Sequence, residues 1–429
     1  MTDQPEPAQH DAPRLTTRQA AELLGVKPET VYAYVSRGQL SSVRAAGGRG
    51  STFDAEEIRA LARRSGRRDA PPAGGDLAFR TGITLIEDDR CYFRGVDAAE
   101  LARRYGYEEV AEWLWTGELR PGARFTAPDG TLAAARRAVE ALPAHSGSTD
   151  RLRVAVTAAA ATDPLRFDLS PEAVLSSARG LIPTLVGALP VLGDPAAEGG
   201  SPAAEGGSPT AEGGSLAAEL WSRLTAEPAD APSVAVLDAA LALLVDHDLA
   251  ASTLAARVAA SARAHPYAVV SAGLGVLEGP LHGAASGLAH RLLREAVDRG
   301  SAVPVVADHL RTGRRVPGLG HRIYRGEDPR ATVLFELLAD APQAGEALAA
   351  AREVVATTAR HAPLHANIDL ALAVLSVSRG MAPDAGETVF AVSRTAGWIA
   401  HALEEYGERP LRIRPSGQYT GPRPPQPLP

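Results

Sequence analysis

The sequence predicts a mostly α-helical protein. Of its 429 residues, 45% are hydrophobic but only 5% are aromatic, and Ala, Leu and Val supply most of the apolar side chains. Ala and Leu favour helices, whereas the β-branched and aromatic runs that build sheets are scarce. From residue 77 onward, apolar residues recur three and four positions apart in segments separated by short Gly/Pro turns, which is the period of helices with one buried face. A chain of this length is expected to form two or three domains.

Residues 15–68 have the pattern of a winged helix-turn-helix. The stretch "LTTRQAAELLG" predicts a first helix capped by Thr16 or Thr17, and "KPETVYAYVSRG" predicts a second. Two short strands are expected around the Gly-Gly turn of "LSSVRAAGGRGSTF". A last helix follows in "DAEEIRALARR", where Asp54 and Glu57 have capping-box spacing. This order of elements resembles the DNA-binding modules of the excisionase and MerR type.

The charge of this unit favours contact with phosphate groups. Ten basic and five acidic residues give residues 15–68 a net charge of +5, whereas the whole chain carries −7. The overall charge and a pI near 5.9 argue against a surface that coats nucleic acid or membrane. A helical module for protein contacts is the alternative to DNA binding. The candidate DNA contacts are Lys27, Thr30, Tyr32, Arg44 and Arg49.

The remaining segments of low complexity predict tails and linkers. We expect a disordered tail at 1–14, a linker at 69–76, a disordered insertion at 194–216 built from "AAEGGSP"-like repeats, and a tail at 423–429. The N-terminus has no signal-peptide pattern, and no stretch is apolar enough to cross a bilayer. With Cys91 as the one cysteine, no internal disulfide can form, so a cytoplasmic location is expected.

Several polar clusters interrupt the apolar helical background. Taken singly they are weak, because a lone histidine before glycine is more often a capping or core residue. Metal-ligand pairs, phosphate-binding loops and the Gly-x-Ser-x-Gly elbow are absent from the sequence. Histidines, a carboxylate and several arginines together suit acid–base chemistry beside a small di- or tricarboxylate. The clusters are "DHDLAAST" with His247, "GPLHGAAS" with His282, "PGLGHRIYRGEDPR" with His321 and Arg330, "HANIDLALAVL" with Asp369, "VSRTAGWIAH" with Arg394, and "RIRPSGQYTGP" with Arg414.

This series of motifs, together with "YFRGVDAAEL" at 92–101, resembles the citrate synthase family in order and spacing. The resemblance runs from about residue 78 to 422. It implies a two-domain, nearly all-helical fold that is dimeric at minimum. A large domain at 77–283 and 380–422 and a small domain at 284–379 would close over the substrates.

The resemblance also implies roles for individual residues. His282 would hydrogen-bond the thioester carbonyl of acetyl-CoA, Asp369 would remove the methyl proton, and His321 would polarise the oxaloacetate ketone. No metal or other cofactor is implied, since the coenzyme A thioester is itself a substrate. Oxaloacetate would be held by His247, Arg330 and Arg394, with Arg414 contributed to the partner subunit's site. Coenzyme A would be bound by Arg325 together with Gly318 and Gly320.

The implied activity is that of an acyltransferase that converts the acyl group to alkyl on transfer, condensing acetyl-CoA with oxaloacetate to citrate in the tricarboxylic acid cycle. Three departures from the family pattern leave the acyl preference open: Ala284 to Ser286 after His282, Ala250 near His247, and Leu370 to Leu372 after Asp369. A 2-methylcitrate synthase that uses propionyl-CoA is the nearest alternative. A DNA-binding regulator whose synthase-derived body senses a metabolite is the alternative from another class.

Overall fold

The computed structural model describes residues 14–24, 26–36, 39–44, 50–64, 79–192, 214–279, 282–283, 285–413 and 420–421. The chain divides into two compact units, one containing the N-terminal residues up to 79 and the other residues 80–414. We describe each by itself.

The N-terminal unit is a helix-turn-helix with a small antiparallel sheet. Its strand order is β1-β3-β2, and Leu15 pairs with Phe53 while Val43 pairs with Thr52. The two strands of the wing were expected, but β1 was not, and Arg14 begins this strand rather than ending a tail. The elements are β1 (Arg14–Thr16), α1 (Thr17–Leu24), α2 (Pro28–Ser36), β2 (Ser42–Arg44), β3 (Ser51–Asp54) and α3 (Ala55–Arg64).

Helix caps fix the boundaries of this unit. The Gln19 amide donates to Thr16 Oγ1 at 3.4 Å, and the Thr16 amide donates to Gln19 Oε1 at 2.9 Å, which is the reciprocal pattern of a capping box. Asp54 Oδ1 accepts the amides of Glu56 and Glu57 at 2.7 and 3.1 Å. The Glu57 side chain, however, binds Ser41 instead of completing the second box.

The second unit begins with a three-stranded antiparallel meander, so the expectation of helix throughout is wrong for residues 84–97. Its strands are β4 (Thr84–Glu87), β5 (Arg90–Phe93) and β6 (Val96–Asp97). The Thr84 hydroxyl donates to the buried Asp246 at 2.5 Å, and the Trp113 indole donates to Phe93 O at 3.1 Å. These bonds attach the meander to the helices behind it.

Helices make up the rest of the second unit. Most of their apolar faces form one large core in which Trp221, Trp398 and Tyr107 are among the largest buried side chains, and a smaller separate cluster includes Leu292 and Val306. Within this unit the helices are α4 (Ala98–Arg104), α5 (Tyr107–Thr116), α6 (Asp129–Glu140), α7 (Ser148–Thr162), α8 (Pro171–Ala188), α9 (Leu216–Leu224), α10 (Ala231–Leu244), α11 (Ala251–Ser261), α12 (Pro266–Leu277), α13 (Ala285–Asp298), α14 (Val303–Arg311), α15 (Pro329–Ala339), α16 (Gly345–Ala359), α17 (Ile368–Ser378) and α18 (Ala385–Tyr406), with a 3₁₀ turn η1 (Pro342–Ala344).

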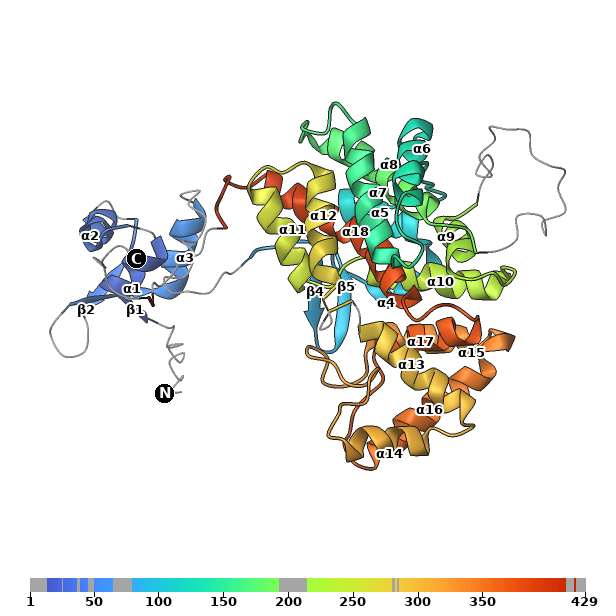
Figure 1. Ribbon diagram of the computed structural model, residues 1–429. Coiled ribbons are helices and arrows are strands. Elements are labelled where there is room, and N and C mark those ends of the chain that lie inside the picture. The colour runs from blue at the N-terminus through green and yellow to red at the C-terminus, as the bar shows by residue number, and fades with distance from the viewer. Residues whose placement is uncertain are drawn as a thin grey trace. The chain divides into compact units, whose positions relative to one another are not determined.

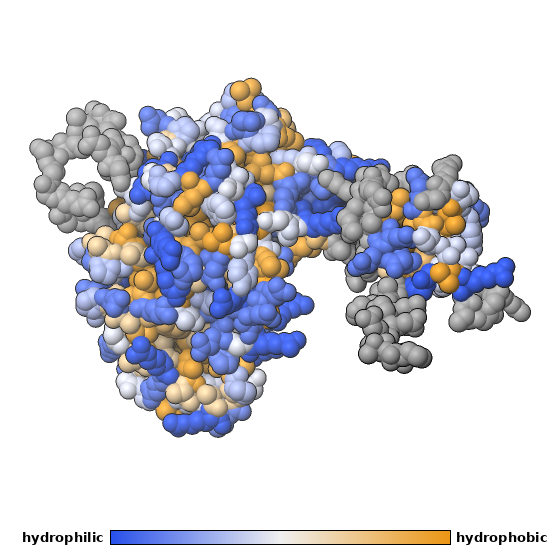
Figure 2. Space-filling view, turned by 180° about the vertical axis from the view of Figure 1, so that it is seen from behind, coloured by the Kyte–Doolittle hydropathy of each residue, from blue (hydrophilic) through white to orange (hydrophobic). Residues whose placement is uncertain are grey.

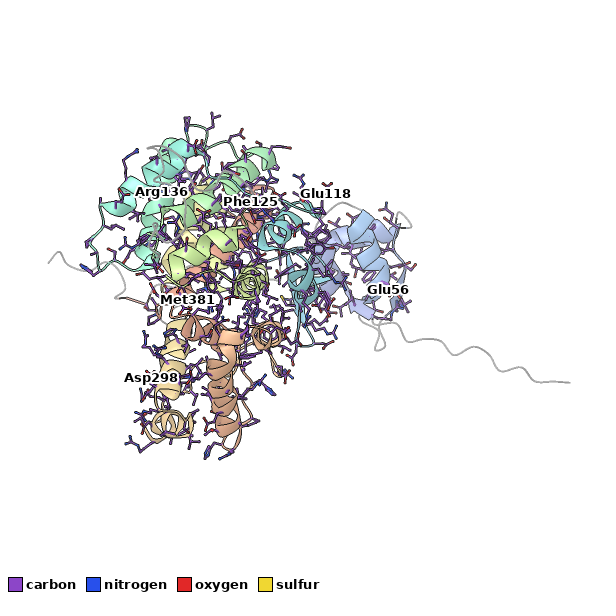
Figure 3. The ribbon with its side chains drawn as sticks, turned by 90° about the vertical axis from the view of Figure 1, so that its right-hand side faces the viewer. Glu56, Glu118, Phe125, Arg136, Asp298 and Met381 are labelled. Carbon is purple, nitrogen blue, oxygen red and sulfur yellow. The ribbon has the colours of Figure 1, made fainter. Side chains whose placement is uncertain are left out.

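The helices of this unit gather into two lobes (Figure 1). Helices α13 to α17 form the smaller lobe, and the long α18 returns from it through the centre of the larger one. Figure 3 shows Phe125 and Arg136 in the larger lobe, Asp298 in the smaller, and Met381 where they meet. On the face shown in Figure 2, hydrophobic patches are interspersed among hydrophilic side chains. Loops between the lobes contact segments that are far away in the sequence, as when the Arg325 amide binds Asp89.

The expected insertion at 194–216 is too long at its C-terminal end. Ser215 caps α9 by accepting the Ala218 amide at 3.3 Å, and Leu216 is buried. Residues 194–213, the linker at 69–76 and the tail at 423–429 lie outside the described residues. None of the described helices combines the length and apolar character needed to span a membrane.

Candidate active site

Two segments that are far apart in the sequence pair beside the start of α17. The Asn367 amide donates to Gly318 O at 3.0 Å, and its side-chain Nδ2 donates to Gly320 O at 2.8 Å. Asn367 is also the N-cap of α17, accepting the Asp369 amide at 3.0 Å. One side chain therefore fixes both the approach to His321 and the helical turn that carries Asp369.

The glycines before His321 serve tight turning and close packing. Gly318 and Gly320 have φ angles of +81° and +77°, which glycine adopts without a steric penalty. A Cβ at Gly318 would lie 2.9 Å from Leu370 Cβ. Leu370 thus fills the space beside the Cα of Gly318, a residue for which the resemblance implies a contact with coenzyme A.

His321 is held in one tautomer. Its Nδ1 accepts the amides of Ile323 and Tyr324 at 3.0 and 3.2 Å, so the proton of the neutral ring sits on Nε2. Burial, reinforced by the Arg330 charge, lowers the pKa of His321 to about 4. Near neutral pH this imidazole is uncharged and carries a hydrogen-bond donor at Nε2.

Tyr324 joins the His321 loop to His247. Its hydroxyl lies 2.9 Å from His247 Nε2, and its ring centroid is 4.7 Å from that of His321. The two histidine rings meet edge-on at 5.3 Å. Burial is the main cause that lowers the pKa of His247, and the charges of Arg330 and Arg394 add to it. Two neutral imidazoles therefore lie side by side near two guanidinium groups.

Arg330 forms a buried bidentate pair with Asp328. Its Nε and Nη2 donate to the two carboxylate oxygens at 2.9 and 2.8 Å, and the side chains are 3% and 1% exposed. Burial opposes the ionisation of both groups and is the largest single effect, but each partner's charge and hydrogen bonds together outweigh it, lowering the pKa of Asp328 and raising the pKa of Arg330. Asp328 also caps α15 and accepts the Ile368 amide at 3.1 Å, which connects this pair to the helix of Asp369.

Asp369 is a carboxyl group whose ionisation is disfavoured. Burial raises its pKa to about 6, with the Arg330 charge acting in the opposite direction and the Asp328 charge in the same direction. A pKa near the working pH suits a group that must accept and later release a proton. A half-buried carboxyl group with a raised pKa beside a charged partner is a candidate functional group.

Arg394 lies on the central helix α18 and faces the segment that carries His247. Its Nε donates to Leu244 O at 2.8 Å. Burial lowers its pKa to about 10 against the opposing charge of Asp246, so it remains cationic near neutral pH. The side chain is 2% exposed.

A buried polar network supports this part of the site. Asp246 lies 3.2 Å from His401 Nε2, and Arg257 Nη1 donates to His401 Nδ1 at 2.8 Å. Arg257 continues to Glu404 and Glu405 at 2.8 and 3.2 Å. Because His401 Nδ1 accepts a bond, its Nε2 proton faces Asp246. The network fixes the carboxylate that neighbours both His247 and Arg394.

His282 lies in the turn that precedes α13. Its Nε2 lies 2.8 Å from the hydroxyl of Ser252, a fully buried residue of α11. Burial and, to a lesser extent, the Arg394 charge lower the pKa of His282 to about 4. Because the Arg394 charge acts on the pKa of His282, the imidazole lies within electrostatic range of the cluster that contains Arg394.

The structure brings most of the expected site residues of the second unit together. His247, His321 and Arg330 are linked by direct contacts or through Tyr324, while Asp369 and Arg394 interact electrostatically with Arg330. The Arg325 side chain is exposed, and its amide binds Asp89 at 2.8 Å. Arg414 lies outside the described residues.

The expected DNA contacts are distributed over the N-terminal unit. Lys27, Tyr32 and Arg44 are exposed, and Thr30 is half-buried. The Tyr32 hydroxyl lies 3.2 Å from Thr17 Oγ1. Arg49 lies outside the described residues.

Sequence reasoning missed several residues that shape the site. Asp328 carries a local signal, because its position before Pro-Arg at a helix start is that of an N-cap. The partners of the histidines are further apart in the sequence and carry no comparable signal. The missed residues are Ser252, Tyr324, Asp328, Asn367 and Asp246.

Comparison with known families agrees with this division into units. A family model described as "Citrate synthase, C-terminal domain" matches residues 74–416, and one described as "Helix-turn-helix domain" matches residues 14–66. A citrate synthase of Haloferax volcanii is 32% identical over 370 residues, covering 81% of this chain and 94% of that protein. A 2-methylcitrate synthase of Shewanella oneidensis is 28% identical, covering 83% of this chain and 96% of that protein.

Solved structures share the fold. The citrate synthase of Pyrobaculum aerophilum superimposes with a TM-score of 0.67 at 24% identity, covering 91% of this chain and 97% of that one. The Thermoplasma acidophilum citrate synthase, solved as a ternary complex with carboxymethyl coenzyme A and oxaloacetate, gives 0.63 at 23% identity and covers 82% and 96%.

Proposed function

Because this chain belongs to the citrate synthase family, we propose that it condenses acetyl-CoA with oxaloacetate to give citrate and free coenzyme A. The observation that carries the proposal is the Asp369 carboxyl group, whose pKa of about 6 is set within a cluster of neutral imidazoles and buried arginines. This cluster contains a base, hydrogen-bond donors and cations for a dicarboxylate.

Asp369 and His282 would generate the nucleophile. A thioester α-proton is too weakly acidic for a carboxylate acting alone, so removal needs a donor at the carbonyl oxygen where charge develops. The Ser252 hydroxyl can donate to Nε2, and the ring proton of neutral His282 would then be on Nδ1, where it can donate to that oxygen. Asp369 takes the methyl proton as the enol forms.

His321 would activate the electrophile. Its Nε2 proton can donate to the oxaloacetate ketone, and the same proton can pass to the alkoxide once the new C–C bond has formed. Water then cleaves the thioester, placing oxygen on the acyl carbon and releasing the thiol. Neutral His321 is suited to this step, because its Nε2 already carries the proton.

His247, Arg330 and Arg394 would hold the two carboxylates of oxaloacetate. Asp328 engages Nε and one N–H of Nη2 of Arg330, so both N–H groups of Nη1 can donate to a substrate. The carboxylate of Asp328 partly compensates the charge of Arg330, and that of Asp246 partly compensates the charge of Arg394. The pocket therefore suits an anion without holding an excess of uncompensated buried charge. The partner subunit would complete the site with the residue at position 414.

The acyl group is the finer part of the proposal. Leu370 packs on Gly318, and Ser286 donates to Gly283 O at 3.1 Å, so two of the positions that depart from the family pattern make internal contacts. One methylene is worth only about 1–3 kcal/mol of discrimination. Thiol release with acetyl-CoA and propionyl-CoA should give the higher kcat/KM for acetyl-CoA. A propionyl preference would assign a 2-methylcitrate synthase instead.

We also propose that the N-terminal unit binds DNA. The helix-turn-helix match, the exposed Lys27, Tyr32 and Arg44, and the net positive charge of residues 15–68 support this second function. A synthase body that only senses its substrates would bind DNA but release no thiol, so the two assays together separate an enzyme from a sensor.

A further inference from the structure

An aspartate stands at an unusual place in the turn that joins β4 to β5. Asp88 and Asp89 are the two central residues of this hairpin, and both have positive φ angles, +49° and +56°. Two-residue turns of this type favour Asn-Gly or Asp-Gly, because a side chain at positive φ is disfavoured. An Asp at the second position calls for a compensating interaction.

The compensating interaction is made with the His321 loop, residues 321–328. Asp89 Oδ1 accepts the Arg325 amide and Oδ2 accepts the Gly326 amide, both at 2.8 Å. These two amides, Arg325 before Gly326, lower the pKa of Asp89. The carboxylate is therefore ionised near neutral pH and makes two charge-assisted hydrogen bonds to consecutive backbone groups.

Gly326 is matched to this contact. A Cβ at position 326 would lie 3.0 Å from Asp89 Oδ2, so the loop lacks a side chain where the carboxylate approaches. The hairpin tip thus supplies a carboxylate, and the loop supplies two amides and a glycine that leaves room for it.

Asp89 secures the middle of a loop whose ends are fixed elsewhere. Asn367 binds Gly320 at one end, and Asp328 binds the Ile368 amide at the other. Between them, Asp89 binds two backbone amides of the loop, and His247 binds the Tyr324 hydroxyl. Figure 1 shows the loop before α15 passing close to the β4–β5 hairpin.

We propose that Asp89 is a positioning residue that holds the His321 loop in its active geometry. The proposal rests on the function proposed above, in which His321 faces the ketone, and on the family resemblance, which implies that Arg325 contacts coenzyme A. Asp89 touches neither substrate; it fixes the backbone that aims both side chains. A loop released at its centre would populate the competent geometry less often, and affinity and turnover would fall with that population.

Two substitutions test this role, one that keeps a side chain at the positive φ of position 89 and one that removes it. Asp89→Asn retains one acceptor but faces the second amide with an NH₂ group, and Asp89→Gly removes the carboxylate while relieving the positive φ. Both should lower kcat/KM for oxaloacetate and for the acyl-CoA together, by about tenfold, with an unchanged or higher melting temperature for Asp89→Gly. Asp88→Asn, the same charge change one residue away in the same turn, should behave as wild type.

Hydrogen exchange provides a readout that does not depend on turnover. The backbone of residues 322–327 should exchange faster in Asp89→Asn than in Asp88→Asn or wild type. Unchanged exchange, or variants that match Asp88→Asn in kcat/KM, would overturn the positioning role while wild-type activity upholds the proposed function. If wild type releases no thiol, the proposed function fails, and the exchange rates alone decide whether Asp89 holds the loop.

Discussion

At the scale of single residues, the site depends on protonation states that differ from those of free side chains. His282 and His321 are neutral because their pKa values fall to about 4, and Asp369 has a pKa of about 6. Burial is the first cause in all three cases, and it opposes the charged form of each group. The same physical effect thus keeps two donors neutral and gives a carboxyl group the basicity of a general base.

The pH dependence of kcat/KM follows from these values. A base acts in its deprotonated form, so kcat/KM should rise as pH increases through about 6 and reach a plateau above it. The two histidines are already neutral over this range and add no second step. Initial rates between pH 5 and 8 at fixed ionic strength check this, and a flat profile between pH 5 and 7 would exclude Asp369 as a base with a raised pKa.

Breaking the Asp328–Arg330 pair should destabilise the fold. Asp328→Asn leaves the buried Arg330 charge without its carboxylate, which should lower the free energy of unfolding by about 3–5 kcal/mol. Denaturant unfolding measures this loss. Glu327→Gln makes the same charge change at an exposed neighbour and should have little effect; equal stability of the two variants would contradict the buried pair.

The residue types of the site could be predicted from the sequence, but their partners could not. His247, His321 and Arg330 stand out because polar groups interrupt apolar helices, and the structure places them in contact. Ser252 and Tyr324 are ordinary in sequence, and only the fold brings them to His282 and His247. Hydrogen-bond partners 30 or 77 residues apart leave no local pattern.

At the scale of elements, the helices were accessible to sequence reasoning and the meander was not. Apolar spacing and turn residues predict long helices such as α18. The strands β4 to β6 have four residues or fewer, and the Asp88-Asp89 turn lacks the Asn-Gly signal of a hairpin. Its turn chemistry is explained by the loop that Asp89 binds, which is a tertiary contact.

The start of α17 offers a test at this scale. Asn367→Ala should lose the cap of α17, at a cost of about 1 kcal/mol, together with the bond to Gly320 O. Asn367→Ser retains a capping oxygen but is too short to reach that carbonyl. Ser should therefore restore most of the stability but not kcat, as measured by thermal unfolding and by thiol release. Full recovery of kcat in Asn367→Ser would show that the bond to Gly320 is dispensable.

At the scale of the whole molecule, the chain joins a helix-turn-helix unit to a synthase body. Composition alone separated them, because a basic segment is followed by Gly/Pro-rich residues and then by an acidic helical body. The functions of the two units are tested independently, since the candidate residues for DNA lie in one unit and those for catalysis in the other.

DNA binding should show a characteristic dependence on salt. If Lys27 and Arg44 contact phosphates, Lys27→Ala and Arg44→Ala should each weaken binding and reduce the slope of log K against log[salt] by about 1, without changing thiol release. Arg18→Ala is the matched control, because Arg18 pairs with Glu22 on the exposed side of α1. Mobility shifts across salt concentrations measure the slope. An absence of binding at low salt would leave the unit as a module for protein contacts.

The most direct test of the enzyme assignment is oxaloacetate-dependent thiol release from acetyl-CoA, measured for wild type and Asp369→Asn side by side. We expect turnover by wild type and a loss of orders of magnitude in the variant, with the fold retained as judged by thermal unfolding. Absence of thiol release from wild type with acetyl-CoA, or near-normal turnover by Asp369→Asn, would contradict the proposed condensation.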